Sequence, residues 1–288
     1  MTAVLRHELS LFYHNMTGYV FGAFLLLFTG IGAMLYNINS SVANFEYVLS
    51  FISVVFVVIV PILTMRIISE ERRQKTDQLV YSLPITSTEI VMGKFFSLIC
   101  VYVMPLIFIA AYPLIFAQYG DVYLPTSYGS LVAFFFMGAA FISMGMYISS
   151  LTESQGMAAG ICIAVMLFNY FCASLSDYVS ATAFGSVVVL VVMCLIIGFI
   201  VRFMTKSTIA GAIVFVLGIG AVLVAYFVGS TTLDNLLPNI MKNLSLYERF
   251  NVFVNGVFDI NGIVYYISVV AFFLFLCVQS LEKRRYNG

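Results

Sequence analysis

Charged residues are scarce in this chain of 288 residues. Asp, Glu, Lys and Arg together make up 9% of it, against about 25% in an average soluble protein. Hydrophobic residues make up 62%, and the mean hydropathy is +1.06. With so few charged residues, the chain cannot form the polar surface that a water-soluble protein needs. The composition therefore predicts a protein that lives in a bilayer, without a separate soluble domain.

Catalytic and nucleotide-binding motifs are also missing. The only histidines are His7 and His14, and neither H-E-x-x-H nor G-x-S-x-G occurs. Gly93-Lys94 has no glycine five residues earlier, so the phosphate-binding G-x-x-x-x-G-K-[ST] loop is absent. The five cysteines form no C-x-x-C pair. The sequence thus predicts a non-catalytic protein that holds no cofactor or metal itself, and nothing in it indicates a nucleic-acid partner.

Long apolar runs recur through the chain. A spanning helix needs about 20 apolar residues, and such runs must be helices because lipid cannot satisfy the hydrogen bonds of the backbone. The runs that qualify are residues 18–37, 48–68, 90–117, 128–151, 155–175, 183–204, 208–228 and 262–281. We therefore predict an all-α, polytopic membrane bundle of eight spans. Six spans are the alternative, with residues 183–228 as one segment on the membrane surface.

Basic residues beside the spans indicate the orientation, because Lys and Arg stay preferentially in the cytoplasm. With the N-terminus inside, only Lys242 and Arg249 of the 13 basic residues face out. An even number of spans returns the basic C-terminus to the cytoplasm. Residues 1–16 are predicted to form an amphipathic helix on the membrane surface. Its apolar positions are Leu5, Leu9, Phe12 and Met16, with Arg6, Glu8 and Asn15 between them.

The predicted spans contain almost no charge. Arg66, Lys94 and Arg202 lie within a turn or two of the cytoplasmic edge, where their side chains can reach water. Ion-coupled secondary transporters usually place ionisable residues inside the membrane, so this alternative is weakened. A non-transporting membrane scaffold is a further alternative. A neighbouring gene for an ATPase would argue against both.

Residues 69–94 form the one long, charge-rich passage between two apolar runs, SEERRQKTDQLVYSLPITSTEIVMGK. Its first part is too polar for lipid, and Pro84 ends any helix there. Thr86 and Glu89 then have the T-x-x-E spacing of a capping box, which starts the next span. The pattern predicts a rigid elbow through which a bound protein can push on two spans at once. An ordinary solvated loop is the alternative.

Several segments match the pattern of one known family. They are Glu71 to Gln74, Thr76, Leu79, Leu83 to Thr86, Glu89 to Lys94, Ser149 to Gln155, Leu244 to Phe250 and Leu281 to Arg285. The chain resembles the permeases of type-2 ABC exporters, especially the gliding-motility-type branch, over residues 1–175 and 240–285. Lys75 and Gln78 depart from it, since the family usually has Gly and Glu there. The family also usually has six spans, so residues 183–228 look like an inserted hairpin. Its candidate roles are a lipid-facing buttress and a contact for an accessory subunit.

The resemblance implies a type-2 ABC exporter transmembrane-domain fold with an extra helical hairpin, in a bacterial cell membrane and with both termini cytoplasmic. It also implies a dimer with a second copy or a homologous permease, on two cytoplasmic ABC ATPases that alone hold ATP and Mg²⁺. An accessory subunit with an extracellular domain is a further candidate partner. The ATPase is expected to press on a coupling segment at residues 69–89 and on the turn after the fourth span, where Thr152 and Gln155 again have capping-box spacing. The coupling residues are Glu71, Arg72, Arg73, Thr76, Leu79, Leu83, Pro84, Thr152 and Glu153.

Two small-residue patterns indicate where subunits could meet. Gly18-x-x-x-Gly22 and Gly156-x-x-x-Gly160 let helix backbones approach closely, and in the family these two spans are the usual subunit seam. Packing within one subunit is the alternative.

Residues 230–261 are predicted to form an extracellular exit gate, because apolar residues recur there on one face of a helix. A simple amphipathic lid is the alternative. The gate residues are Leu236, Ile240, Leu244, Tyr247 and Phe250. A route rich in Phe, Tyr, Met and Leu favours an amphipathic or hydrophobic substrate, such as a peptide, an antibiotic or a lipid.

Overall fold

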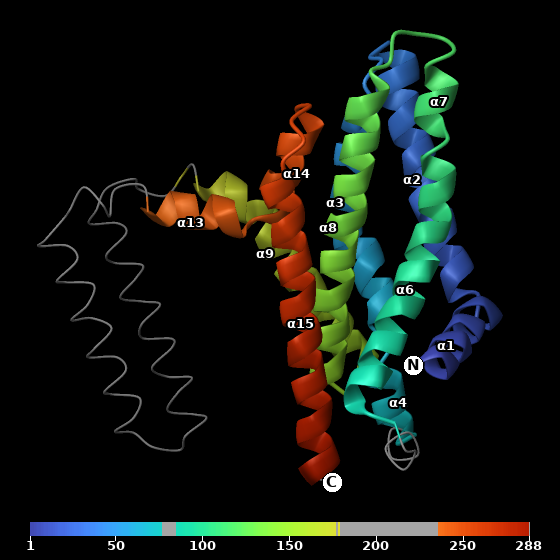
Figure 1. Ribbon diagram of the computed structural model, residues 1–288, viewed down its shortest axis with the longest axis vertical. Coiled ribbons are helices and arrows are strands. Elements are labelled where there is room, and N and C mark those ends of the chain that lie inside the picture. The colour runs from blue at the N-terminus through green and yellow to red at the C-terminus, as the bar shows by residue number, and fades with distance from the viewer. Residues whose placement is uncertain (77–84, 177, 179–235, 288) are drawn as a thin grey trace, which may run out of the picture. The chain divides into compact units, whose positions relative to one another are not determined.

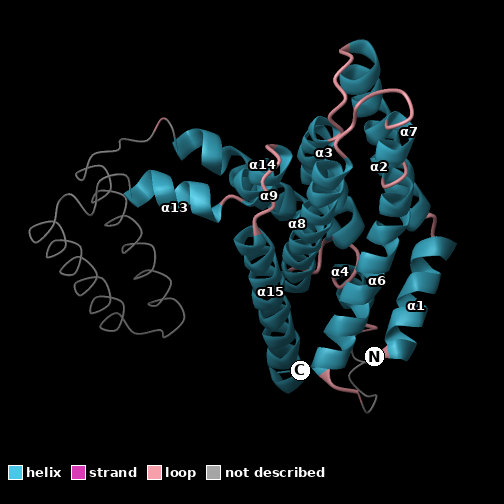
Figure 2. Ribbon diagram, turned by 45° about the horizontal axis from the view of Figure 1, so that its top comes forward, coloured by secondary structure: helices cyan, strands magenta, loops and turns pink. Residues whose placement is uncertain are grey.

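The structure, a computed structural model, describes residues 1–76, 85–176, 178 and 236–287. Within these ranges every regular element is a helix and there is no β-strand (Figure 2). The all-α prediction is therefore confirmed for the described residues. The chain divides into two compact units, Met1–Phe168 with Arg249–Gly288, and Asn169–Glu248.

Six helices of the described residues are long and apolar enough to cross a membrane. They are Thr17–Asn39, Glu46–Gln74, Ser87–Phe116, Leu124–Leu151, Gln155–Ser176 and Ile260–Arg285. Each overlaps one of the predicted spans. The remaining two predicted spans, 183–204 and 208–228, lie outside the described residues. The choice between six and eight spans therefore stays a prediction.

The first unit is a bundle of long helices with both chain termini at one end, beside α4 (Figure 1). We call this the termini end. α3 packs against α2 and α8, α15 packs against α8 and α6, and α1 packs against α6. In both units together, the helices of the described residues are α1 (Thr2–His14), α2 (Thr17–Ala33), the π-helix η1 (Met34–Asn39), α3 (Glu46–Thr64), α4 (Ser69–Gln74), α6 (Ser87–Ile109), α7 (Tyr112–Phe116), α8 (Leu124–Leu151), α9 (Gln155–Ser176), α13 (Leu236–Leu244), α14 (Leu246–Val254) and α15 (Ile260–Asn287).

Aromatic side chains form the core where α3, α6, α8 and α14 meet. The rings of Phe56 and Phe134 stack with centroids 4.6 Å apart, and Phe250 lies 5.9 Å from Phe134. Tyr102 is fully buried, and its hydroxyl donates a hydrogen bond to the backbone carbonyl of Phe134 at 2.9 Å, which compensates the cost of burying that polar group. Gly138 of α8 lies directly against the ring of Tyr102, where a side chain would collide with it. Close helix packing here depends on a small residue.

Helix α1 falls within the predicted amphipathic segment, but one of its polar residues faces inward. Phe12 and Glu8 are its buried side chains, and both lie on the side toward the bundle. The chain then turns into α2 at Met16, which adopts a left-handed conformation with φ 58°. The assignment of Glu8 to a polar outer face is wrong, because Glu8 has a partner inside the bundle. Whether α1 lies on a membrane surface stays a prediction.

Candidate functional site

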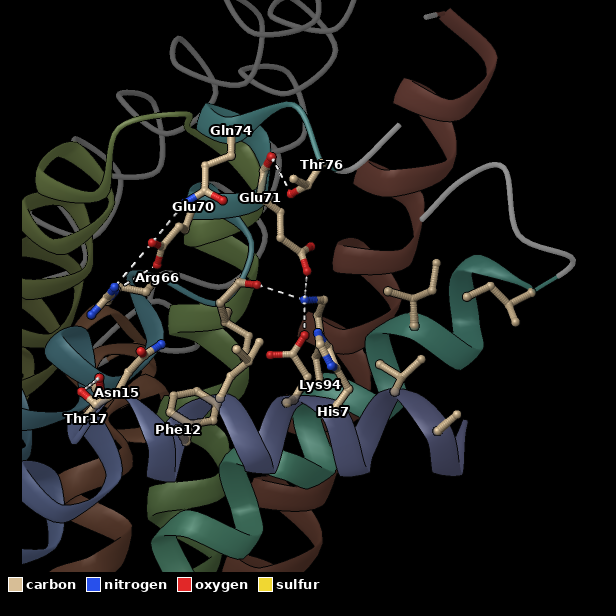
Figure 3. A pocket seen from close by; sticks show the side chains of 17 residues that line it. His7, Phe12, Asn15, Thr17, Arg66, Glu70, Glu71, Gln74, Thr76 and Lys94 are labelled. Carbon is tan, nitrogen blue, oxygen red and sulfur yellow. Dashed lines mark hydrogen bonds and ion pairs between the residues drawn. The ribbon is translucent and has the colours of Figure 1, made fainter. Parts of the chain in front are cut away.

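A buried ion-pair cluster centres on Lys94, near the start of α6. The side chain of Lys94 is 2% exposed, and its Nζ donates hydrogen bonds to Oε1 of Glu8 at 2.7 Å and Oε1 of Glu71 at 2.6 Å. The third bond goes to the carbonyl oxygen of Ile67 at 3.0 Å. Figure 3 shows the three bonds converging on the ammonium group. The expectation that Lys94 reaches out to water is therefore wrong.

The cluster is stable only as a set. An ammonium group taken out of water costs several kcal/mol unless opposite charges and hydrogen bonds compensate it. Here all three N–H groups are used, and the partners come from α1, from the residue stretch between α3 and α4, and from α4 itself. The side chain of Lys94 thus ties α6 to both α1 and α4, which are distant from it in the sequence.

Helix α4 depends on a second distant contact. It has only six residues, too few for a helix that is stable alone. The backbone N–H groups of Ile68 and Ser69 donate to Oγ of Ser149, on α8, at 3.3 and 3.1 Å, and Ser149 donates to the carbonyl of Met65 at 3.1 Å. A side chain from another span thus satisfies the orphan amides at the start of α4.

The far end of α4 adopts an unusual backbone conformation. Lys75 follows the helix with φ 56° and ψ 22°, the left-handed region in which glycine is strongly preferred at helix ends. This gives a physical reason for the glycine that the resembled family usually has at this position.

The basic side chains of α4 and its C-terminal cap differ in exposure. Arg73 and Lys75 are exposed, whereas Arg72 is buried. Of the two predicted coupling arginines, only Arg73 is therefore exposed.

The capping box before α6 is confirmed. Oγ1 of Thr86 accepts a hydrogen bond from the N–H of Glu89 at 3.3 Å, and Glu89 accepts one in return from the N–H of Thr86 at 3.2 Å. The second predicted capping box is wrong. Thr152 is the C-terminal cap of α8, and the hydroxyl of Ser154 accepts from the N–H of Met157 at 3.5 Å. The cap of α9 therefore lies two residues later than the spacing suggested.

Glu153, in the turn between α8 and α9, is held by the C-terminal helix. Nη2 of Arg284 donates to Oε1 of Glu153 at 2.8 Å. This hydrogen bond and the charge of Arg284 hold the pKa of the Glu153 carboxyl below its ordinary value, with smaller contributions from the charges of Arg72 and Lys75. The end of α4 therefore lies close enough to the turn to act on its charge.

The next residue of α15, Arg285, contacts the segment before α6. Nη1 of Arg285 donates to the carbonyl of Ile85 at 3.1 Å, just before α6. The structure thus gathers most of the predicted coupling residues at the termini end, in a surface that we call the platform. The platform consists of residues 69–76, 85–89, 152–154, 284 and 285. The predicted coupling residues Leu79, Leu83 and Pro84 lie outside the described residues.

A cavity of about 650 Å³ lies behind the platform, between α1, α6 and the region joining α3 to α4. Figure 3 shows its side chains from close by. The lining residues are Ala3, Val4, His7, Glu8, Leu11, Phe12, Asn15, Thr17, Arg66, Ile67, Glu70, Glu71, Gln74, Thr76, Ile85, Ile90 and Lys94. Sequence reasoning missed this site, because its residues come from separate helices and share no spacing pattern.

The predicted seam glycines have different surroundings. A side chain at Gly18 would contact the carbonyl of Phe12 and the ring of Tyr13, so this glycine packs on α1 of its own chain. Gly22 lies near Pro105, whose Cβ is 4.0 Å from the place of a side chain. No atom of the described residues lies within 4 Å of that place at Gly156 or Gly160. The two glycines of α9 are therefore open to a partner, and Gly18 is not.

The predicted gate residues lie on two short helices. Leu236, Ile240 and Leu244 belong to α13, where Ile240 and Leu244 are exposed. Tyr247 lies in the first turn of α14 and meets the ring of Tyr170 edge-on, with the ring centroids 5.1 Å apart. Phe250, further along α14, belongs to the aromatic core described above.

The comparison with family models gives one finding. A model described as ABC-2 family transporter protein matches residues 20–184. That range begins within α2 and extends past the end of α9, and it includes Glu71, Lys94 and Glu153. Neither the curated proteins nor the solved structures give a match.

Replacing Lys94 tests the weight of the buried cluster. Lys94→Met keeps the shape of the side chain but leaves Glu8 and Glu71 facing each other without a cation. We expect the free energy of unfolding to fall by about 3–5 kcal/mol, as for other buried pairs that lose one partner. Thermal unfolding in detergent measures this, with Lys283→Met on the exposed end of α15 as the control. Equal melting temperatures for the two variants would contradict the buried cluster.

The conformation of Lys75 gives a second prediction. Lys75→Gly removes the strain of a left-handed side-chain-bearing residue and is expected to stabilise the protein by about 1 kcal/mol. Arg73→Gly, two residues earlier and inside α4, is expected to destabilise it by about 1 kcal/mol. Melting temperatures that shift in the same direction would show that residue 75 does not end the helix in this way.

Proposed function

This chain belongs to the ABC-2 transporter family, and we propose on that premise that it is the permease subunit of an ATP-driven exporter. The family match and the six candidate spans support a multi-pass membrane component of an ABC transporter. We place ATP and Mg²⁺ on a separate cytoplasmic ABC ATPase, so that the permease itself catalyses no reaction. The gliding-motility-type branch and a bacterial cell membrane, with both termini cytoplasmic, belong to the same proposal.

The observation that carries the coupling proposal is the platform. A partner that pushes on the exposed side of α4 meets a helix tied through Glu71 to Lys94 and through Ser149 to α8. The push would therefore reach α6, α8 and, through Glu8, α1 together. Rigid, hydrogen-bonded links of this kind can transmit a displacement without local unfolding. We infer that ATP-driven closure of two ATPases shifts the spans between inward-open and outward-open or closed states.

The dimer proposal rests on the open face of α9. Gly156 and Gly160 allow a helix of a second permease, identical or homologous, to approach closely. The seam on the α2 side is then formed by Gly22, since α1 of the same chain covers Gly18.

The other parts of the proposal concern the exit and the substrate. Residues 230–261 act as the exit gate, and the substrate is an amphipathic or hydrophobic molecule. An accessory extracellular subunit remains part of this proposal.

An ion-coupled secondary transporter is the second candidate function, and one observation favours it. Glu8, Glu71 and Lys94 are ionisable residues in and beside a candidate span, the type of group that proton-coupled carriers use. Transport by the purified chain without any ATPase would decide for this candidate.

The coupling proposal is tested at Arg73, because Glu71 also holds Lys94 and its loss would disturb the fold. Arg73→Glu reverses an exposed charge on α4, and Arg6→Glu reverses one on α1 as the control. An exposed ion pair contributes about 0.5–1 kcal/mol, so we expect about two- to fivefold weaker stimulation of the partner ABC ATPase. Reconstituted vesicles with both proteins provide the measurement. Unchanged ATPase stimulation and export in Arg73→Glu would contradict the proposal.

The seam is tested by cross-linking in a variant whose five native cysteines are replaced by alanine. Gly160→Cys is expected to form a disulfide-linked dimer in the membrane, because its side chain would point into open space between subunits. Gly18→Cys is the matched control and should stay monomeric, since α1 covers it. Non-reducing gels report the result. Equal dimer yields from the two positions, or none at Gly160, would argue against a homodimer seam on α9.

A further inference from the structure

The cavity behind α1 has more negative than positive charge around it. Its lining contains three carboxylates, Glu8, Glu70 and Glu71, and two permanent cations, Arg66 and Lys94. Lys94 is already shared between Glu8 and Glu71. Arg66 is bound by Glu70, at 2.9 Å from Nε and 3.3 Å from Nη2. The cavity therefore suits a ligand that brings a positive charge.

Glu8 offers a hydrogen-bond acceptor to such a ligand. The residue is 6% exposed, and one carboxylate oxygen, Oε1, accepts from Lys94. The other oxygen has no hydrogen-bond partner among the residues that the structure describes, and Glu8 lines the cavity. This second oxygen is not among the fully buried side-chain atoms that lack a partner, so it can accept a hydrogen bond from a donor that enters the cavity. An N–H group of a ligand would supply that donor.

Arg66 offers the opposite chemistry. Its Nη1 makes no hydrogen bond within the described part of the chain, and its side chain is 36% exposed. Figure 3 shows Arg66 with Asn15 and Thr17 on one side of the cavity, and Lys94 with His7 on the other. A ligand that fits both sides carries an anionic group and, a short distance away, an ammonium group.

The position of the cavity indicates where such a ligand comes from. Thr17 begins the first candidate span, and Arg66 lies near the end of the apolar part of the second. The cavity therefore lies at the depth of lipid headgroups. Leu11 and Phe12 add apolar surface for the glycerol and acyl region.

We propose that this cavity binds the headgroup of an ethanolamine phospholipid from the surrounding leaflet. The primary ammonium group donates to Glu8, and the phosphate accepts from Arg66. A choline headgroup has no N–H to donate, and a glycerol headgroup has no cation, so neither satisfies Glu8 in this way. The inference needs only a chain embedded in a bilayer, and it goes beyond the proposed transport function.

The test measures lipid binding to the purified full-length chain by native mass spectrometry, with no ATPase present. Short-chain phosphatidylethanolamine, phosphatidylcholine and phosphatidylglycerol are titrated in detergent. We expect the ethanolamine lipid to bind about tenfold more tightly than the other two, because it alone makes the charge-assisted bond to Glu8. Glu8→Gln should abolish this preference while Glu71 still neutralises Lys94. Glu282→Gln, on α15 and outside the cavity lining, should retain it.

A second variant separates the two halves of the headgroup. Arg66→Gln is expected to weaken binding of the ethanolamine lipid but not of dodecylamine, which has an ammonium group and no phosphate. Equal binding of all three lipids, or a preference that persists in Glu8→Gln, would overturn the proposal. Phosphoethanolamine that bound as tightly as the lipid would assign the cavity to a soluble ligand instead. Because transport is not measured, failure here leaves the exporter proposal untouched.

Discussion

One ammonium group holds the termini end of this protein together. Lys94 is almost completely excluded from solvent, and its three hydrogen bonds reach Glu8 on α1, Glu71 on α4 and the carbonyl of Ile67 between α3 and α4. Lys94 and Glu8 alone would each be a buried charge without compensation, whereas Glu71 is partly exposed. Together they fix the angle at which α1 and α4 leave the bundle. The platform and the cavity behind it both take their shape from this constraint.

The rest of the platform is built in the same manner, from contacts across the sequence. A six-residue helix such as α4 has little stability of its own, and it persists because Ser149 satisfies its first amides. The C-terminal helix then secures two edges, with Arg284 on Glu153 and Arg285 on the carbonyl of Ile85. The platform is therefore cross-linked by hydrogen bonds between segments that are distant in the sequence. That property is what a permease needs if a separate ATPase drives it.

A buried cluster beside a cavity also connects the two proposals physically. The same carboxylate of Glu8 that anchors α1 to Lys94 turns its second oxygen toward the space in which a lipid headgroup would fit. Occupancy of the cavity would therefore act on the link that joins α1 to α4. A bound lipid and the partner ATPase would then both act on the charges of Glu8, Glu71 and Lys94.

Sequence alone determined the helical, membrane-spanning character of the chain, because an apolar run of about 20 residues has no other stable form in lipid. It also located the capping box at Thr86 and Glu89, since capping is a matter of local spacing. It wrongly predicted that Glu8 and Lys94 face water, because the polarity of a side chain does not reveal whether an oppositely charged partner lies inside the bundle. It likewise predicted a cap at Thr152, whereas Ser154 accepts the hydrogen bond at the start of α9, a difference that local backbone geometry decides. The buried cluster, the cap from Ser149 and the cavity exist only in the tertiary structure, because each joins residues from helices that no sequence period relates.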